Sequence, residues 1–407
     1  MLHYLFAVVV ATTLARAALQ LRARRTTLRQ LRALVLCKDE PGDVSSGQRA
    51  SVVLIANPIA GSGEGLAIAR ALRDLAARMG TGMRAELRES VCAGHPRQLA
   101  ASVANDGFTH VLSVGGDGQL HEVLNGLHDA CALEGVRVLH VPAGTGNGIA
   151  TSLGIHSAAH AARALAGNQS VLLDAWSVTT KPPRQPTLCA LSVGWGAVAD
   201  IDALAEREWR WLGPLRIPLI GAIMVGFHRA VTGAVWFTPA RADSGSREGV
   251  ALECALASGR VRIAEGGPHG CTHVISDYFF LVHACNVASI ATNCLMAPRA
   301  RPADGNLTLC VVRACCGRLG AARVLLSVSA AALRPGAEEE MHGAPDDVGG
   351  RLERYACTRL AIVPEASERK SRFAVDGEPL EAATLAASHA LGPKGRPLRV
   401  RVLVPPA

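Results

Sequence analysis

The stretch that decides the fold is Ser113-Val114-Gly115-Gly116-Asp117-Gly118-Gln119-Leu120-His121-Glu122-Val123-Leu124-Asn125-Gly126-Leu127. The apolar residues that lead into it, from Val111 to Val114, predict a buried strand that runs into a glycine turn. After the turn, apolar residues recur at 120, 123, 124 and 127, which is the spacing of one helix face. The stretch therefore predicts a strand, a turn and a helix in direct succession.

The turn has the composition of a ligand-binding loop. Gly115, Gly116 and Gly118 permit positive φ angles and a close backbone approach to a ligand, and the first N–H groups of the next helix favour an anion. A carboxylate is a poor phosphate ligand, so Asp117 is better interpreted as a base or a metal-linked acid beside the phosphates. From this stretch alone an alternative stays open, in which the glycines only turn the chain and Asp117 caps the helix.

Two similar units flank this one. Ser51–Ala56 is followed by the loop Asn57–Gly65, and Val136–Val141 is followed by the loop Pro142–Gly148. Repeated strand, glycine loop and helix units are typical of a parallel α/β sheet with ligand loops at the carboxyl ends of its strands. No Gly-Lys-Ser/Thr sequence follows these loops, so a Walker A loop is excluded.

After Asp174 short strand-like runs are separated by Gly, Pro and Asp turns, and few helices are expected. The runs are 188–193, 231–237, 250–256, 278–283, 307–312, 359–363 and 398–404. They predict an antiparallel β-sandwich, with mobile loops at 241–249 and 336–351. We therefore expect an α/β nucleotide domain over 49–180, three-layered with glycine-rich loops, and a β domain over 181–407.

Composition and charge narrow the class of protein. The chain has 407 residues, 49% of them hydrophobic, which suffices for two buried cores. Residues 1–38 contain seven basic residues and no acid, so they account for most of the net charge of +8. A nearly neutral body argues against nucleic-acid binding. The twelve cysteines form no CxxC pair, which favours reduced thiols in a cytosolic protein over disulfides or zinc.

Residues 1–48 form a leader and linker. The apolar run Leu2–Ala15 is short for a membrane span. Arginines at 22, 25, 29 and 32 then recur at helical spacing, which predicts an interfacial amphipathic helix. A signal anchor, a cleaved signal peptide or a helix packed on the body are alternatives. We expect peripheral membrane association, with an N-terminal membrane anchor as an open alternative.

A set of motifs carries a family resemblance. Asn57-Pro58, the Gly115–Gly118 loop, Glu122–Leu127 and Pro142–Asn147 together resemble the catalytic domain shared by diacylglycerol, ceramide and sphingosine kinases. Three later stretches, at 195–202, 210–216 and 373–378, resemble sphingosine kinases in particular. The resemblance runs in order from about Ser51 to Leu403 and does not cover residues 1–48.

The resemblance implies a site between two lobes, with ATP as the phosphate donor. Residues near the nucleotide would be Asn57, Pro58, Ile59, Ser90, Glu122, Gly144, Thr145, Gly146, Arg210, Arg216, Asp376, Gly377 and Glu378. Substrate contacts would come from Gly115, Gly116, Asp117, Gly118 and Asp202, with Asp117 as catalytic base. The chain departs from the family pattern at Gly115, Gln119 and Gly148, and one extra residue between Asp202 and Leu212 makes Arg210 a less secure match than Arg216.

The resemblance also implies a reaction, which is phosphorylation of the primary hydroxyl of sphingosine or a related base. Mg²⁺ is the expected cofactor; Glu378, and alternatively Asp117, would lie near it, although its ligands are not assigned. Asp202 would hold the lipid ammonium, or else it caps or pairs locally with Arg207 or Arg210. Runs 219–227 and 278–281 line an alkyl tunnel or belong to the core. Alternatives are a diacylglycerol or ceramide kinase and a catalytically silent lipid-binding relative; a homodimer is left open.

Overall fold

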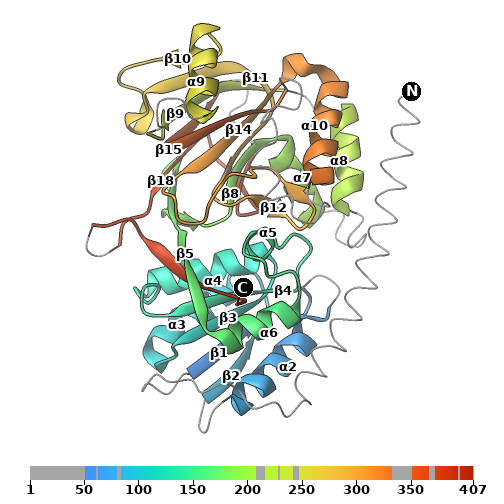
Figure 1. Cartoon of the computed structure of the whole chain (residues 1–407), viewed down its shortest axis with the longest axis vertical. Coiled ribbons are helices and arrows are strands. Elements are labelled where there is room, and N and C mark those ends of the chain that lie inside the picture. The colour runs from blue at the N-terminus through green and yellow to red at the C-terminus, as the bar shows by residue number, and fades with distance from the viewer. Residues whose placement is uncertain are drawn as a thin grey trace. The chain divides into compact units, whose positions relative to one another are not determined.

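The computed structural model describes residues 51–60, 63–79, 84–207, 216–227, 230–241, 247–331, 351–365, 372–392 and 395–406. They divide into two compact units, drawn in Figure 1. The first unit contains the described residues up to Leu173 together with those from Arg399 onward. The second runs from Asp174 to Leu398. The leader, residues 1–48, lies outside the described residues.

The first unit is built on a six-stranded sheet. Its strands, in spatial order, are β2 (Arg84–Glu89), β1 (Ser51–Ala56), β3 (His110–Gly115), β4 (Arg137–Pro142), β19 (Arg399–Val404) and β5 (Gln169–Asp174). The pairs from β2 across to β19 are parallel. The chain passes from β1 to β2 on one side and then to β3 on the other, so a topological switch point lies between β1 and β3, where α/β sheets place their ligands.

Helices cover both faces of this sheet (Figure 1). They are α2 (Gly65–Arg78), α3 (His95–Asp106), α4 (Asp117–Asp129), α5 (Gly148–Ser152) and α6 (Ala158–Gly167). Helix α2 contacts α6, and α3 packs closely on α4. Gly126 permits that packing, because a Cβ atom there would lie 2.1 Å from the Arg97 carbonyl oxygen. The predicted three-layer α/β arrangement is thereby confirmed.

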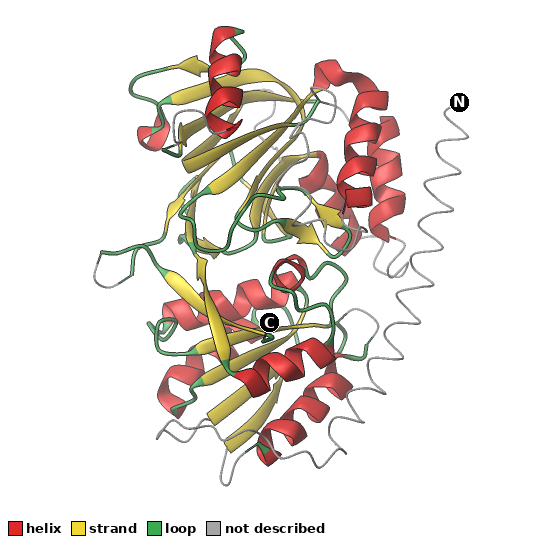
Figure 2. Ribbon diagram, viewed as in Figure 1, coloured by secondary structure: helices red, strands yellow, loops and turns green. Residues whose placement is uncertain are grey.

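The second unit is built on one antiparallel sheet that Figure 2 shows in yellow. Its main path is β17 (Glu378–Glu381), β16 (Arg372–Val375), β8 (Ser192–Gly196), β11 (His273–Cys285), β14 (Leu307–Arg313), β15 (Glu353–Pro364), β18 (Thr384–His389), β6 (Trp176–Lys181) and β7 (Thr187–Cys189). Strand β9 (Val231–Pro239) pairs with both β11 and β15, and β10 (Arg262–Ile263) pairs with β11. The sheet therefore turns back on itself.

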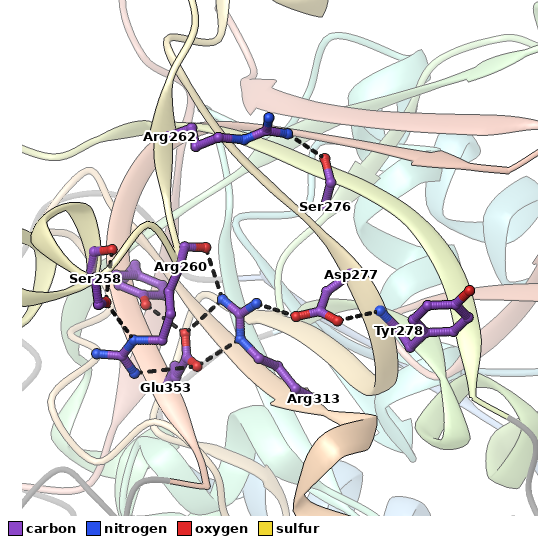
Figure 3. Close-up of polar contacts among 10 residues, drawn as sticks. Ser258, Arg260, Arg262, Ser276, Asp277, Tyr278, Arg313 and Glu353 are labelled. Carbon is purple, nitrogen blue, oxygen red and sulfur yellow. Dashed lines mark hydrogen bonds and ion pairs between the residues drawn. The ribbon is translucent and has the colours of Figure 1, made fainter.

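The sheet closes around one apolar core. Trp176, Trp195, Phe237, Phe279 and Phe373, from five different strands, are fully buried in it. Ion pairs of Arg313 join three neighbouring strands, as Figure 3 shows. Arg313 pairs with Asp277 and donates from Nε to Glu353 at 2.8 Å. Because these residues come from β14, β11 and β15, the ion pairs hold three strands in register. The predicted antiparallel β domain is confirmed. Its strands belong to one sheet that folds over on itself.

Helices cover the other face of β11 and β14. They are α7 (Ala197–Arg207), α8 (Arg216–Phe227) and α10 (Gly317–Ala331), beside the hairpin β12 (Ser289–Ala291) and β13 (Cys294–Leu295). A second apolar cluster lies between them and the sheet and includes Ala197, Leu281, Val312 and Val324. The remaining elements are α9 (Arg247–Ala257) and the single turns Pro268–Gly270 and Ala314–Cys316.

Three expectations require correction. Residues 250–256, predicted as a strand, lie in α9, since a short apolar run does not distinguish a buried strand from a helix face. The final strand at 398–404 exists as β19, but it pairs with β4 in the first unit and is not part of the β domain. Helices are also more frequent after Asp174 than expected.

Of the loops predicted to be mobile, 242–246 and 336–350 lie outside the described residues. Within the described part of the chain, no helix is long and apolar enough to span a membrane.

Candidate active site

The loops at the carboxyl edge of the first sheet are bonded to one another. The Asn57 N–H donates to the Val114 carbonyl at 3.2 Å, across the switch point. Gln119 Nε2, on the first turn of α4, donates to the Ile55 carbonyl at 2.6 Å. The end of β1 and the glycine loop after β3 are therefore held together.

Gly115 and Gln119, two positions at which the chain departs from the family pattern, lie in contact with each other. A Cβ atom on Gly115 would lie 2.7 Å from Gln119 Oε1, so the glycine makes room for the glutamine side chain. Gln119 is buried and bonds the strand end. The small residue at 115 and the long one at 119 are thus coupled by space, and neither removes a charge from the site.

Ser90 and Glu122 join the same edge. The Ser90 N–H donates to the Ala56 carbonyl at 2.8 Å, which ties the end of β2 to β1. Both carboxylate oxygens of Glu122 accept from the Gly94 N–H, at 2.9 and 3.0 Å. Asn57, Ser90 and Glu122, all predicted beside the nucleotide, are therefore brought together at the carboxyl edge of the sheet.

The two glycine loops pack backbone against backbone. A Cβ atom on Gly144 would lie 2.3 Å from the Gly116 Cα atom, a distance that no side chain tolerates. Asn147 adopts a positive φ of 57° and closes its own loop, accepting from the Gly144 N–H at 3.1 Å and donating to its carbonyl at 2.8 Å. Such a glycine-lined edge is suited to a bulky anionic ligand such as a nucleotide.

Asp117 locks these loops together. Its carboxylate is 9% exposed and accepts from the Gly148 N–H at 2.8 Å and the Ile149 N–H at 3.2 Å, at the start of α5. Gly146 passes so close that a Cβ atom there would lie 3.0 Å from Asp117 Oδ2. The carboxylate therefore bonds the backbone of a different helix from the one that Asp117 begins.

In the second unit, Asp376 is hydrogen-bonded to the backbone of residues 190–192. It lies in the turn between β16 and β17 with a positive φ of 53°, and it is 2% exposed. Its carboxylate accepts from the backbone N–H groups of Ala190, Leu191 and Ser192, at 2.8 to 3.2 Å. Asp376 therefore fixes the turn that carries Gly377 and Glu378, and Glu378 is exposed.

Asp202 lies on α7 and is half-buried. Burial, with added effects from Cys310 and Asp202, raises the pKa of the Cys294 thiol to about 12, so these groups share one environment. The neighbouring acid is different, because Asp200 pairs with Arg372 of β16 at 3.6 Å. Arg216 begins α8, and its side chain lies outside the description, as does the whole of Arg210.

The chain is similar in sequence to known lipid kinases. Residues 51–178 match the diacylglycerol kinase catalytic domain. The chain is 26% identical to sphingosine kinase 1 of Homo sapiens over 353 residues, which is 80% of this chain and 85% of that protein. It is 27% identical to sphingosine kinase 1 of Arabidopsis thaliana over 329 residues, which is 72% of this chain and 66% of that protein.

Residues 51–178 are therefore similar to the diacylglycerol kinase catalytic domain, and the chain is similar over most of its length to sphingosine kinases. The fold agrees, since a solved structure of a candidate diacylglycerol kinase from Bacillus anthracis superposes with a TM-score of 0.56. The match covers 89% of this chain and 98% of that one at 16% identity. The resemblance predicted from the motifs is confirmed.

One residue beside Asp117 could not be predicted from the sequence. His140, at the end of β4, is fully buried, and its Nδ1 lies 3.9 Å from Asp117 Oδ1. Burial lowers the His140 pKa, and the Asp117 carboxylate opposes this only in part, so the ring is neutral near pH 7. The signal was a polar residue within an apolar strand, directly before a glycine loop.

The described residues contain no cluster of three His, Cys, Asp or Glu side chains suited to a metal ion. Enzymes that transfer phosphoryl groups usually hold Mg²⁺ through one or two carboxylates together with substrate phosphates. Such a site does not need a cluster of three protein ligands. The predicted roles of Glu378 and Asp117 near Mg²⁺ stay predictions.

Proposed function

We propose that this chain transfers the γ-phosphoryl group of ATP to the primary hydroxyl of sphingosine or a related sphingoid base. The observation that carries the proposal is Asp117, a buried carboxylate held by the Gly148 and Ile149 N–H groups at a glycine-lined switch point. The names of the relatives support the substrate class, since both compared kinases are described as sphingosine kinases.

The nucleotide would lie over the carboxyl edge of the first sheet. Backbone N–H groups and the glycine loops at 115–118 and 144–146 would approach its phosphates closely, since they carry no side chains. Asn57, Pro58, Ile59, Ser90, Glu122 and Thr145 would border the same ligand. Arg210 and Arg216 would supply planar donor forks for phosphate oxygens, with Gly377 and Glu378 on the turn that Asp376 anchors.

Asp117 would act as the base. The two backbone N–H groups at the start of α5 orient its carboxylate, which would accept the proton of the attacking hydroxyl. A positioned base is typically worth about 10²–10⁴-fold in rate. When bound, Mg²⁺ supplies charge neutralisation at the phosphates, with Glu378 as its proposed protein partner.

Asp202 would select the lipid head group. A sphingoid base carries an ammonium beside the reacting hydroxyl, and a half-buried carboxylate attracts it. A neutral diacylglycerol offers that carboxylate no positive charge. Helix α8 packs on α7, the helix that carries Asp202, because Ile220 and Met224 contact Ile201 and Leu204. The alkyl chain would lie in this apolar layer.

The second candidate substrate is diacylglycerol or ceramide, which the match to the diacylglycerol kinase domain favours. A catalytically silent relative is disfavoured, because Asp117, Asp202, Arg216 and Glu378 are all present. For residues 1–48 we propose peripheral attachment to a membrane, which presents the lipid. A homodimer stays an open proposal.

The test is transfer of labelled phosphate from ATP and Mg²⁺ to sphingosine, diacylglycerol and ceramide, each dispersed at equal mole fraction in detergent micelles. We expect sphingosine to be phosphorylated with the highest kcat/KM, and no transfer by Asp117→Asn. Equal or greater turnover of diacylglycerol would overturn the substrate assignment. Absence of transfer to every lipid would overturn the enzyme assignment.

A further inference from the structure

His283 lies in β11 on the face that the helices cover. The side chains before and after it on that face, Leu281 and Cys285, belong to the apolar cluster that includes Ala197 and Val198 of α7. The alternate side chains, Val282 and Ala284, point into the central core instead. Since neighbouring side chains of a strand face opposite ways, His283 faces the layer beneath α7.

The sheet makes a place for the imidazole ring. His283 pairs with Gly194 of β8, and a Cβ atom on Gly194 would lie 2.9 Å from His283 Nδ1. On the other side His283 pairs with Cys310 of β14. Any larger residue at 194 would displace the ring, so the glycine and the histidine form one feature.

Within the described part of the chain, this ring is a polar group without a hydrogen-bond partner. His283 is 2% exposed, and neither ring nitrogen has a hydrogen-bond partner among the residues that the structure describes. Burial lowers its pKa to about 4, so it is neutral near pH 7. A neutral imidazole offers one donor and one acceptor, and a hydroxyl group can satisfy both. Buried polar groups that stay unpaired are rare.

The ring and the proposed head-group acid share this layer. Asp202 projects from α7, and both Asp202 and Cys310 act on the Cys294 thiol. Cys310 is the direct strand partner of His283. Because Ala197 and Val198 of α7 pack in the same cluster as Leu281 and Cys285, a lipid whose ammonium lay at Asp202 would bring the adjoining carbons of its chain toward the layer that contains the ring.

We propose that His283 is a specificity-determining residue that hydrogen-bonds a secondary hydroxyl of the sphingoid base. This inference rests on the proposed function. It adds selectivity among sphingoid bases, since bases with that hydroxyl are preferred to those without it. A site that hydrogen-bonds a substrate hydroxyl rejects the analogue lacking it, because its own polar group is then left unpaired.

The experiment compares three amino alcohols of equal chain length, which differ by one hydroxyl each: phytosphingosine, sphinganine and 2-aminooctadecan-1-ol. For the unaltered chain we expect kcat/KM to fall by about 10–100-fold between the base with the recognised hydroxyl and the base without it. In His283→Leu this difference in kcat/KM should shrink to less than about threefold. The KM for ATP should not change, because His283 acts on the lipid alone.

Two further variants support the interpretation. Gly194→Ala should weaken the discrimination while His283 is present, because the added methyl group displaces the ring. The matched control is Cys285→Ala, on the same face two residues along, which should leave the discrimination intact. Thermal unfolding of each variant shows that the fold persists; Leu at 283 should not destabilise it, since it replaces an unpaired buried polar group.

The outcomes separate the two proposals. If all three bases are phosphorylated and the steps in kcat/KM are the same with His and Leu at 283, the inference about His283 is overturned while the proposed function stands. If none is phosphorylated, both fail. An equal change in the Cys285→Ala control would also overturn the inference, because the effect would then come from packing.

Discussion

At the scale of single residues, Asp117 combines two roles that one substitution can separate. Asp117→Asn replaces one carboxylate oxygen with an amide donor that faces the Gly148 and Ile149 N–H groups. We expect kcat to fall at least about 10²–10⁴-fold, as for loss of a general base. ATP affinity should change little, and the free energy of unfolding should fall by about 1–3 kcal/mol. Single-turnover transfer, nucleotide titration and urea unfolding measure the three quantities.

Full turnover by Asp117→Asn would eliminate this residue as the base. A large loss of ATP affinity would mean instead that its main role is to hold the two glycine loops together for the nucleotide.

Asp202 and Asp200 form a matched pair on α7. Asp202→Asn removes the proposed counter-charge of the lipid ammonium, so KM for sphingosine should rise about tenfold or more while KM for ATP is unchanged. Asp200→Asn removes the same charge two residues earlier, from an acid that pairs with Arg372. It should have less than about a threefold effect, as is usual for exposed ion pairs. Steady-state kinetics on both substrates decides this, and equal effects of the two variants would contradict a head-group role.

At the scale of elements, the packing of α3 on α4 depends on one missing side chain. Gly126→Ala would place a methyl carbon 2.1 Å from the Arg97 carbonyl oxygen and push the helices apart. Because α4 begins at Asp117, both stability and catalysis should suffer. We expect a loss of about 1–3 kcal/mol, as for overpacking elsewhere. Urea unfolding measures it, with Gly135→Ala as control, where a Cβ atom has an ordinary 3.5 Å contact. Equal stability of the two variants would show that the helices adjust freely.

The turn between β16 and β17 is the corresponding element of the second unit. Asp376→Asn should weaken the bonds to the 190–192 backbone and destabilise the fold by about 1–3 kcal/mol. Glu378→Gln, two residues on and exposed, should leave stability unchanged and lower the affinity for Mg²⁺ and ATP. Unfolding curves and nucleotide titrations of the two variants separate these roles. A stable Asp376→Asn protein would contradict the anchoring role.

At the scale of the whole molecule, local pattern predicted each unit's class but not every partner. The glycine loops and buried strands at 51–56, 111–114 and 136–141 were sufficient for the parallel sheet, because each pattern is contained within its own unit of sequence. The pairing of β19 with β4 joins residues more than two hundred positions apart, which no local pattern records.

The site divides in the same way. Asp117 and its glycines could be predicted, because the chemistry is written in consecutive residues. His140 and His283 could not, because their burial, and the approach of His140 to Asp117, arise only when strands pair. Asp376 was predicted near a ligand from its motif, whereas its bonds to residues 190–192 depend on how the sheet folds.

The buried histidines make the stability of the molecule depend on pH. Burial lowers the pKa of His283 from 6.5 to about 4 and also lowers those of His110 and His140. The folded chain therefore binds fewer protons than the unfolded chain below pH 6.5. The stability contributed by the neutral rings is complete above pH 6.5 and is lost as pH falls toward 4.

For His283 the full loss is on the order of 3 kcal/mol, from 1.36 kcal/mol per pKa unit. We expect urea midpoints to fall steadily between pH 6.5 and 4, and the fall to be smaller in His283→Leu, which has no ring to protonate. The comparison is made variant against parent at each pH, so that carboxylates common to both cancel. An identical pH dependence in the two proteins would mean that the ring is already paired or hydrated in the folded state, and would remove the unpaired imidazole on which its proposed choice of lipid depends.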